Sequence, residues 1–338
     1  MKKVENHPII PSFKIGVLLV NLGTPEGTQY FPMRKYLNEF LSDKRVIELP
    51  KLVWKPILNL FILTFRPRKS GKMYEKIWNK KKNQSPLRVN TEEQAEKLKQ
   101  KFNKNKVMLD WAMRYGNPSI ESKILNLTKN GCMKILIVPL YPQYSATTTA
   151  SVMDKVFDVM KKIRWQPSLR TLAPYYDEEL YIEKIVKQIR AHIKKLKWKP
   201  QAIICSFHGL PKKYFMKGDP YHCQCVKTNR LIKEKLEKEI KNVEFCFQSR
   251  FGPQEWLKPY MNEKFKELID RNVKKVCMVA PGFSSDCLET LEEIAIGGKE
   301  EFFEMGGTHF SYIGCLNDSK DSIELIQKLI QKNLKGWI

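Results

Sequence analysis

A histidine ends an apolar run in the stretch CSFHGLPKKYFMKGDPYHCQC, residues 205–225. Residues 202–207 are mostly apolar, which predicts a buried parallel strand that delivers His208 at its carboxyl end. Gly209 and Pro211 then turn the chain. Because open α/β sheets bind ligands at the carboxyl ends of their strands, His208 is a candidate catalytic residue. A structural, hydrogen-bonded histidine beside the core is the alternative.

Two carboxylates in the segment PGFSSDCLETLEEIAIGG, residues 281–298, are candidates to act with this histidine. Glu289 and Glu293 are four residues apart, so in a helix they share one face, where like charges repel unless they are solvated, protonated or bound to a cation. A histidine with such carboxylates can bind a divalent metal weakly or accept protons from a substrate. The alternative is structural, because Glu289 follows Asp286 by three residues, as in a capping box.

The sequence motifs of other common chemistries are absent. There is no Gly-x-Gly-x-x-Gly, no phosphate-binding Gly-Lys-Ser, no His-Glu-x-x-His and no Gly-x-Ser-x-Gly. Five histidines and no Cys-x-x-Cys pair disfavour a tight zinc site. Cys223 and Cys225 form a Cys-x-Cys pair, so a metal or cluster there is a minor alternative to ordinary thiols.

The elements that must position these residues repeat along the chain. Apolar strands alternate with helical stretches, as in parallel α/β units. Strand-and-loop landmarks occur in the same order in both halves: NLGTP, RYGNP and YPQYSATTT at 21–25, 114–118 and 141–149, then FHGLP, RFGP and PGFSSDCLET at 207–211, 250–253 and 281–290. A duplication predicts two similar Rossmann-like domains, each a parallel sheet flanked by helices, whose strand ends line a cleft between them. Chance similarity of strand and loop patterns is the alternative.

We place the first domain at residues 14–170 and the second, which carries His208 and Glu289, at residues 171–317. The C-terminal helix, 318–338, is expected to complete the first domain. Between its first two landmark strands, the first half has about 50 residues more than the second. These extra residues form an insertion.

The insertion contains an apolar and basic stretch, LPKLVWKPILNLFILTFRPRK, residues 49–69. Its length and basic rim suit a helix that lies on a membrane surface, and a core helix with charged ends is the alternative. If it is interfacial, the apolar surface is expected to come from Trp54, Ile57, Leu58, Phe61, Ile62 and Phe65.

Composition and charge narrow the class of protein. The chain has 338 residues and a net charge of +24, which favours an anionic partner. Nucleic acid is not expected, because the lysines are scattered and no recognition module is present. No uncharged stretch reaches the ~20 residues needed to span a bilayer. The first apolar run, 17–20, has no cleavage site behind it, so we expect a cytoplasmic protein with reduced cysteines.

Taken together, these motifs resemble those of the ferrochelatase family. The resemblance runs in order from about Val17 to the C-terminus, and its most specific segments are SFHGLP, FQSRFGP and SDCLETLEE. It implies two Rossmann-like domains around a porphyrin cleft. It also implies a lyase that inserts Fe²⁺ into protoporphyrin IX, with release of two protons and no redox change. This reaction is the terminal step of haem biosynthesis.

The resemblance also implies roles for individual residues. His208 and Glu289 match the iron-binding positions, and Glu293 matches a further carboxylate, so all three are expected to be catalytic. Arg114 and Tyr115 match a pair on the opposite wall that is implied in iron delivery. The other matches are porphyrin-contacting positions and basic residues near the propionates: Leu22, Tyr74, Ser85, Trp256, Arg66 and Lys69.

The stretch 49–69 matches the hydrophobic lip of the family. This match implies peripheral contact with the inner face of the membrane. It also suggests that an upstream, porphyrin-donating enzyme is a partner.

The chain departs from the family pattern at its cysteines. It ends at Ile338 without the extension that holds a [2Fe–2S] cluster in animal members, and Ala146 replaces that cluster's distant cysteine. We therefore expect no tightly bound cofactor, although Cys223 and Cys225 leave a bacterial-type cluster open. Cys287 stands where some members have a second histidine, which argues against a relay there.

Two other functions stay open. A chelatase for coproporphyrin, or for another metal such as Co²⁺, would need more basic residues at the cleft mouth and less of an apolar lip. A non-catalytic haem or porphyrin carrier would need an axial ligand but no base on the second face. The long lip favours protoporphyrin, and the presence of both His208 and Glu289 favours an enzyme.

Overall fold

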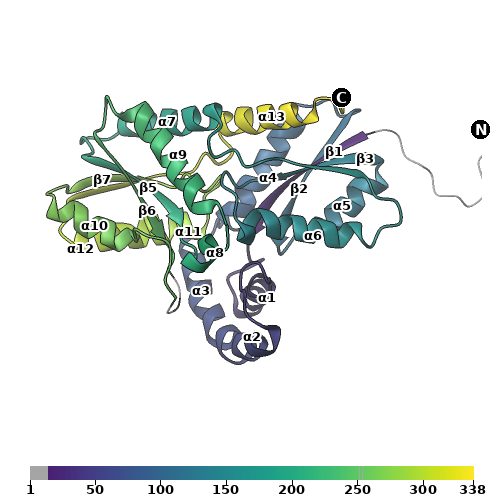
Figure 1. Ribbon diagram of the computed structural model, residues 1–338, viewed down its shortest axis with the longest axis horizontal. Coiled ribbons are helices and arrows are strands. Elements are labelled where there is room, and N and C mark those ends of the chain that lie inside the picture. The colour runs from purple at the N-terminus through teal and green to yellow at the C-terminus, as the bar shows by residue number, and fades with distance from the viewer. Residues whose placement is uncertain (1–13, 251, 253) are drawn as a thin grey trace, which may run out of the picture.

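Two four-stranded parallel sheets form the framework of the molecule (Figure 1). The computed structural model describes residues 14–250, 252 and 254–338, so the start of the chain and Phe251 and Pro253 of the RFGP landmark lie outside the described residues. The strand orders are β2-β1-β3-β4 and β6-β5-β7-β8. The strands are β1 (Lys14–Gly23), β2 (Val107–Tyr115), β3 (Cys132–Pro139), β4 (Ser168–Thr171), β5 (Ala202–His208), β6 (Asn242–Gln248), β7 (Lys275–Val279) and β8 (His309–Ile313).

The same strand order in both sheets confirms the predicted α/β class and the internal duplication. β1 and β5 each lie between two neighbours, and the landmark loops follow equivalent strands in the two halves. The edge strands β4 and β8 were not predicted. Both are short and only partly buried, so they carry no continuous apolar run that sequence reasoning could detect.

The helices cover the sheets in layers (Figure 1). One face of the first sheet packs against α5 and α6, and one face of the second packs against α10 and α12. The other faces of both sheets share a single apolar core with α4, α7, α9 and α13. These helices are α4 (Pro86–Lys99), α5 (Ile120–Lys129), α6 (Ser151–Met160), α7 (Glu179–Ile193), α9 (Tyr221–Leu236), α10 (Met261–Asp270), α12 (Lys299–Glu304) and α13 (Lys320–Leu334).

The C-terminal helix α13 packs against α4, α7 and β3. Arg170, just before the predicted boundary, donates hydrogen bonds to the carbonyls of Asn333 (2.8 Å) and Lys335 (2.9 Å). These contacts attach α13 to the first sheet, on the side where it was expected. The division at residues 170 and 317 stays a prediction, because the two halves share one continuous core.

The insertion forms a separate helical unit below the two sheets in Figure 1. It consists of α1 (Tyr30–Leu41), α2 (Lys51–Ile57), a π-helical segment (Leu58–Ile62) and α3 (Leu63–Ile77). Its own apolar cluster includes Met33, Leu58, Leu63, Tyr74 and Tyr115. The insertion is therefore packed on the end of β2 through a core of its own.

The apolar surface of the insertion differs from the predicted one. Leu58 is buried, Ile62 is half-buried, and Trp54 is half-buried with its indole N–H donated to the carbonyl of Leu41 at 2.7 Å. Including these three in the exposed surface was wrong, because they anchor the helices to each other. The prediction was right for Ile57, Phe61 and Phe65, which are exposed. The other exposed large apolar side chains of the insertion are Phe31, Leu49, Leu52, Val53 and Leu60. Among the described residues, no helix is both long and apolar enough to cross a membrane.

Candidate active site

His208 lies at the carboxyl end of β5, the strand that pairs with both β6 and β7. Its Nδ1 is 2.6 Å from the carbonyl oxygen of Gly209. Because a carbonyl can only accept, Nδ1 carries the hydrogen and Nε2 keeps its lone pair in the neutral ring. The half-buried ring is thus oriented by the backbone and presents a free base or metal ligand.

Gly209 is required by the close approach of its neighbours. A Cβ at this position would lie 2.7 Å from the backbone oxygen of Gln248 and 3.1 Å from the ring of Trp256. The Gly209 N–H also donates to that oxygen at 2.7 Å. The glycine after the histidine therefore lets β6 and Trp256 close around the end of β5.

Glu289 and Glu293 follow β7 in consecutive helical pieces. Glu289 lies in α11 (Leu288–Leu291), and Glu293 begins a π-helical segment (Glu293–Gly298). Gln248 donates to the carbonyl of Glu289 at 2.6 Å, and Ser249 donates a hydrogen bond to the Glu293 carboxylate. Both residues are thus tied to the end of β6, which is the immediate neighbour of His208.

The Glu293 carboxyl group has a perturbed pKa. Burial raises the pKa above its ordinary value and the negative charge of Glu289 raises it further, while the bond from Ser249 and the charge of His208 act in the opposite direction. The charges of His208 and Glu289 therefore both act on Glu293, and the catalytic role of the three residues stays a prediction. A carboxylate with a raised pKa is a stronger base than an ordinary glutamate.

The capping-box interpretation of Glu289 is wrong. Helix α11 begins after Cys287, whose backbone N–H donates to Oγ1 of Thr290 at 3.0 Å. Asp286 instead accepts hydrogen bonds from the hydroxyls of Thr290 (2.9 Å) and Tyr312 (2.8 Å). The Glu289 side chain is thus not used in capping.

The charges of the same carboxylates act on two side chains of the insertion. Burial raises the pKa of Tyr74, and the charge of Glu289 adds to this effect. Burial lowers the pKa of Arg66, while Tyr36, Glu293 and Glu289 partly offset that effect. The charges of Glu289 and Glu293 thus act on Arg66 of the insertion, and Tyr74 lies within the insertion's apolar cluster.

A salt bridge holds the insertion against this side of the second half. Lys76 of α3 bonds to Glu292 at 2.8 Å. Leu22 and Leu288, one from each half, both pack partly buried against the insertion's cluster. The insertion and the carboxylate-bearing segment are therefore direct neighbours.

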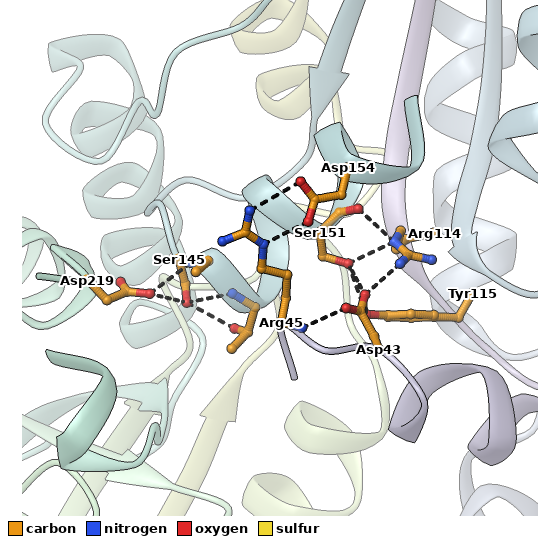
Figure 2. A network of polar contacts seen from close by, with 10 residues as sticks. Asp43, Arg45, Arg114, Tyr115, Ser145, Ser151, Asp154 and Asp219 are labelled. Atoms are coloured by element: carbon orange, nitrogen blue, oxygen red, sulfur yellow. Dashed lines mark hydrogen bonds and ion pairs between the residues drawn. The ribbon is translucent and has the colours of Figure 1, made fainter. Parts of the chain in front are cut away.

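Arg114 and Tyr115 end β2 and meet a common partner, Asp43 (Figure 2). The Asp43 carboxylate accepts from Arg114 (2.5 Å), from the hydroxyl of Tyr115 (2.8 Å) and from Ser151 (2.5 Å). The Tyr115 side chain is fully buried, and the Arg114 guanidinium lies over its ring at 4.4 Å from the ring centre. Both predicted site residues are therefore committed to internal contacts.

The segment that carries Asp43 links the insertion to both halves. Arg45 pairs with Asp154 of α6 at 2.7 Å (Figure 2). Toward the second half, Tyr214 of α8 (Lys212–Met216) donates to the carbonyl of Val46 at 2.9 Å. Helix α8 follows His208 closely in the chain, so residues 43–48 connect the two sides at the base of the insertion.

The other predicted contacts lie in three different environments. Ser85 is buried and caps α4 by accepting from the Arg88 N–H at 3.3 Å. Lys69 is exposed on α3. Trp256 is buried against Gly209 beside His208, and its indole N–H has no hydrogen-bond partner among the described residues. Of these, only Trp256 adjoins the proposed reacting histidine.

Sequence reasoning missed Asp43 and Asp219. Asp219 of the GDPY turn accepts from the Ser145 hydroxyl at 2.9 Å (Figure 2) and from the Ala146 N–H at 2.8 Å. It also accepts from the Tyr221 N–H at 3.0 Å. It thereby joins the loop after β3 to the start of α9. The only available signal was an aspartate in a Gly-Asp-Pro turn, which does not name a partner.

The described residues contain no group of three or more histidine, cysteine, aspartate or glutamate side chains arranged to hold a metal ion. Cys223 is exposed whereas Cys225 is fully buried, so α9 does not present the two thiols to one site. Two surface cavities of about 330 and 470 Å³ are lined by residues around Lys14 and around Lys184, and neither includes His208.

Two solved structures with similar folds show the same two-domain arrangement. SirB from Bacillus subtilis with Fe³⁺ has a TM-score of 0.57 and 14% identity, covering 96% of this chain and 98% of its own. The sirohydrochlorin chelatase of Bacillus subtilis subspecies spizizenii in complex with cobalt has a TM-score of 0.55 and 12% identity, with the same coverage. The chain thus has the two-domain chelatase fold.

The sequence comparisons identify the family. The ferrochelatase family model matches residues 14–334. The ferrochelatases of Agrobacterium fabrum and Rhizobium etli are 51% and 52% identical to this protein over 98% of its chain and 97% of theirs. The chain belongs to the ferrochelatase family.

Proposed function

We propose that this protein is a lyase that inserts Fe²⁺ into protoporphyrin IX and releases protohaem and two protons, the terminal step of haem biosynthesis. The observation that carries the proposal is the His208 ring in a chain of this family. Its Nδ1 is fixed on the Gly209 carbonyl at 2.6 Å, which leaves Nε2 as an oriented lone pair, and the charge of this residue acts on Glu293. A porphyrin must lose two pyrrole protons, and such a group can accept them.

In this mechanism Nε2 of His208 accepts a proton from a pyrrole nitrogen. Glu293, which burial makes more basic, can receive a proton from the same side. Before it takes the proton, the same Nε2 is proposed to bind iron together with Glu289, because one lone pair cannot hold iron and a proton at once. Fe²⁺ is a substrate that must leave with the product, so a site with one histidine and one carboxylate suits transfer better than a closed four-ligand site.

The porphyrin is proposed to contact Leu22, Arg66, Lys69 and Trp256. Leu22 is half-buried between the sheets and the insertion, and Trp256 adjoins Gly209 next to His208. Arg66 and Lys69 supply cations for the propionates. Tyr74, Ser85, Arg114 and Tyr115 support the site through the internal contacts described above, and we propose that they shape its walls.

An anaerobic assay tests this function. Purified protein is given Fe²⁺ with protoporphyrin IX or with coproporphyrin III, and metalloporphyrin formation is followed by absorbance. The proposal expects faster turnover with protoporphyrin. Preference for coproporphyrin, or for Co²⁺ over Fe²⁺, would support the other chelatase functions. Tight porphyrin binding without any metal insertion would identify a carrier.

We also propose that the exposed surface of the insertion binds the membrane peripherally. Leu52, Leu60, Phe61 and Phe65 are 90%, 66%, 61% and 70% exposed. The cations Lys51, Lys55, Arg68 and Lys69 are exposed on the same helices. Each basic residue near an anionic surface contributes about 1 kcal/mol, so binding should be reversible and salt-sensitive.

Vesicle sedimentation tests the membrane proposal. Wild type should co-sediment with anionic vesicles at low salt and dissociate at high salt. The double variant Leu52→Ser with Phe61→Ser should bind more weakly. The matched control, Leu125→Ser with Phe157→Ser, removes exposed apolar groups from α5 and α6 and should bind like wild type. Equal binding by all three proteins would contradict the proposal.

A cytoplasmic location at the inner face of the membrane completes the proposal. All eight cysteines are free, which fits a reducing compartment. A porphyrin-donating enzyme is the proposed upstream partner, and no tightly bound cofactor is proposed.

A further inference from the structure

Asn317 occupies a turn between β8 and α13 and bonds to Asp286, three residues before Glu289 in the chain. Its backbone is left-handed, with φ of 50°. Its side-chain oxygen accepts from the N–H of Asp286 (2.7 Å) and from the side-chain amide of Asn90 (2.9 Å). Its own amide donates to the Asp286 carboxylate at 2.7 Å. Asn317 therefore forms a reciprocal pair with Asp286.

Asp286 passes this constraint to the helix that carries Glu289. The Asp286 residue is only 7% exposed, and its carboxylate accepts from the hydroxyls of Thr290 and Tyr312 as well as from Asn317. Asp286 and Thr290 lie on either side of Glu289. Helix α11 continues into the π-helical segment and α12, and these contacts fix its N-terminal end, where Glu289 lies.

The same asparagine is attached to the first half. Gln94 of α4, which is fully buried, donates to the backbone oxygen of Asn317 at 2.6 Å. On the next turn of α4, Thr91 accepts from Asn21 at 3.0 Å, and Asn21 accepts from the Leu22 N–H at 2.9 Å. Helix α4 therefore connects the two halves: Thr91 bonds to the end of β1, and Gln94 and Asn90 bond to Asn317, the partner of Asp286 at the start of α11.

We propose that Asn317 is a positioning residue for iron insertion, which holds Asp286 and thereby fixes Glu289 relative to the first half. The inference rests on the proposed function of Glu289. Asn317 itself does not touch the substrate. Its side chain is suited to this position because one amide can donate to the carboxylate of Asp286 and accept from its N–H, while asparagine tolerates the left-handed backbone.

The first test removes the side chain without straining the turn. Asn317→Gly keeps a residue that favours positive φ. We expect kcat to fall about 10-fold, as for a displaced catalytic group, with an unchanged porphyrin Kd. Hydrogen exchange of the 286–293 segment should be faster. The matched control is Asn272→Gly, at an exposed turn after α10 with φ of 59°, which should change neither kcat nor this exchange.

The second test exchanges the two partners. Asn317→Asp places a carboxylate against that of Asp286, and Asp286→Asn alone leaves two amides to share the contact. Each single variant should lose about 10-fold in kcat. The double variant has one amide and one carboxylate again, with the same net charge as wild type. It should recover to within about threefold of the wild-type kcat.

The outcomes separate this inference from the function on which it rests. A wild-type protein without insertase activity would refute the proposed function, and exchange of the 286–293 segment would still report whether Asn317 holds α11. If Asn317→Gly lowers only the melting temperature, with wild-type kcat and exchange, then Asn317 has a purely structural role. A double variant no better than the worse single variant would also overturn the inference.

Discussion

Each of the two sheets carries a polar cluster at the carboxyl end of one of its strands. The two clusters differ in how many of their polar groups have hydrogen-bond partners. In the first half, the Asp43 carboxylate accepts from Arg114, Tyr115 and Ser151, and from the backbone of Arg45. In the second half, His208 uses one ring nitrogen on a carbonyl and keeps the other open. The end of β2 in the first sheet thus supports a closed network, and the end of β5 in the second supports one with a free lone pair.

This difference indicates which cluster reacts and which one holds structure. A buried ion pair with satisfied hydrogen bonds is costly to disturb, so the Asp43 network is suited to fixing the base of the insertion. Groups with an open lone pair or a raised pKa, such as His208 and Glu293, are suited to proton transfer. An iron-delivering role for Arg114 and Tyr115 would require breaking contacts of 2.5 and 2.8 Å.

The largest expected effect is that of His208→Ala. Iron insertion should fall by about 10³-fold or more, because the oriented base and ligand are both lost. Porphyrin binding, measured by fluorescence quenching, should persist. The control is His192→Ala, which removes a histidine bonded to Ser311 at 2.7 Å, remote from β5. If the rate of iron insertion by His208→Ala stays within about threefold of the wild-type rate, His208 is neither the base nor an iron ligand.

Glu293→Gln should have the next largest effect, a loss of about 10²-fold in kcat. It should also change how stability depends on pH. Burial and the charge of Glu289 raise the folded-state pKa of Glu293, so the wild type loses stability as the pH rises from the ordinary glutamate value of 4.5 through the raised value. Glutamine does not ionise.

The melting temperature of Glu293→Gln relative to wild type should therefore rise with pH across that window. It should be constant at lower pH, where both side chains are neutral. Differential scanning at several pH values measures this difference. A difference that falls as the pH rises would contradict a raised pKa.

The position of His208 could be predicted from the sequence more readily than the hydrogen-bond network around Asp43. His208 follows an apolar strand and precedes Gly-Leu-Pro, so the local pattern alone placed it at the carboxyl end of a strand. The partners of Asp43 lie 71, 72 and 108 residues away, so their convergence depends on the fold. Local motifs can thus locate a strand-end base but not a network assembled from distant segments.

The insertion shows the same limit within one helix. Its apolar composition predicted a surface, but Leu58 and Trp54 turn inward while Leu52 is 90% exposed. The π-helical segment at Leu58–Ile62 shifts the helical phase, and sequence periodicity does not distinguish it from an α-helix. The same applies to the π-helical segment that starts at Glu293.

Asp43→Asn tests the closed cluster and should act on stability more than on rate. Burial by itself would raise the pKa of Asp43, but the bonds from Ser151, Arg45 and Tyr115 and the charge of Arg114 hold it below its ordinary value of 3.8. The variant leaves the Arg114 charge, 12% exposed, without its counter-ion, at a cost of about 3 kcal/mol.

The pH dependence has the opposite sign to that of Glu293. The stabilisation by Asp43 is present above the ordinary carboxyl pKa and is lost as the pH falls through the depressed value. The gap in unfolding free energy between wild type and Asp43→Asn should therefore narrow at acid pH. Urea titrations at neutral and acid pH measure it, and a gap that widens on acidification would contradict the network.

Tyr115→Phe should have the smallest effect. The ring would keep its place in the insertion's cluster, 5.1 Å from the ring of Phe40, and Arg114 would still pair with Asp43. Only one hydroxyl is lost, so we expect a cost of about 1 kcal/mol in urea unfolding and an unchanged KM for Fe²⁺. If Tyr115 instead hands iron to the porphyrin, KM for Fe²⁺ should rise with little change in stability. That result would show that the Asp43 cluster is not purely structural, because Tyr115 would then take part in the reaction as His208 does.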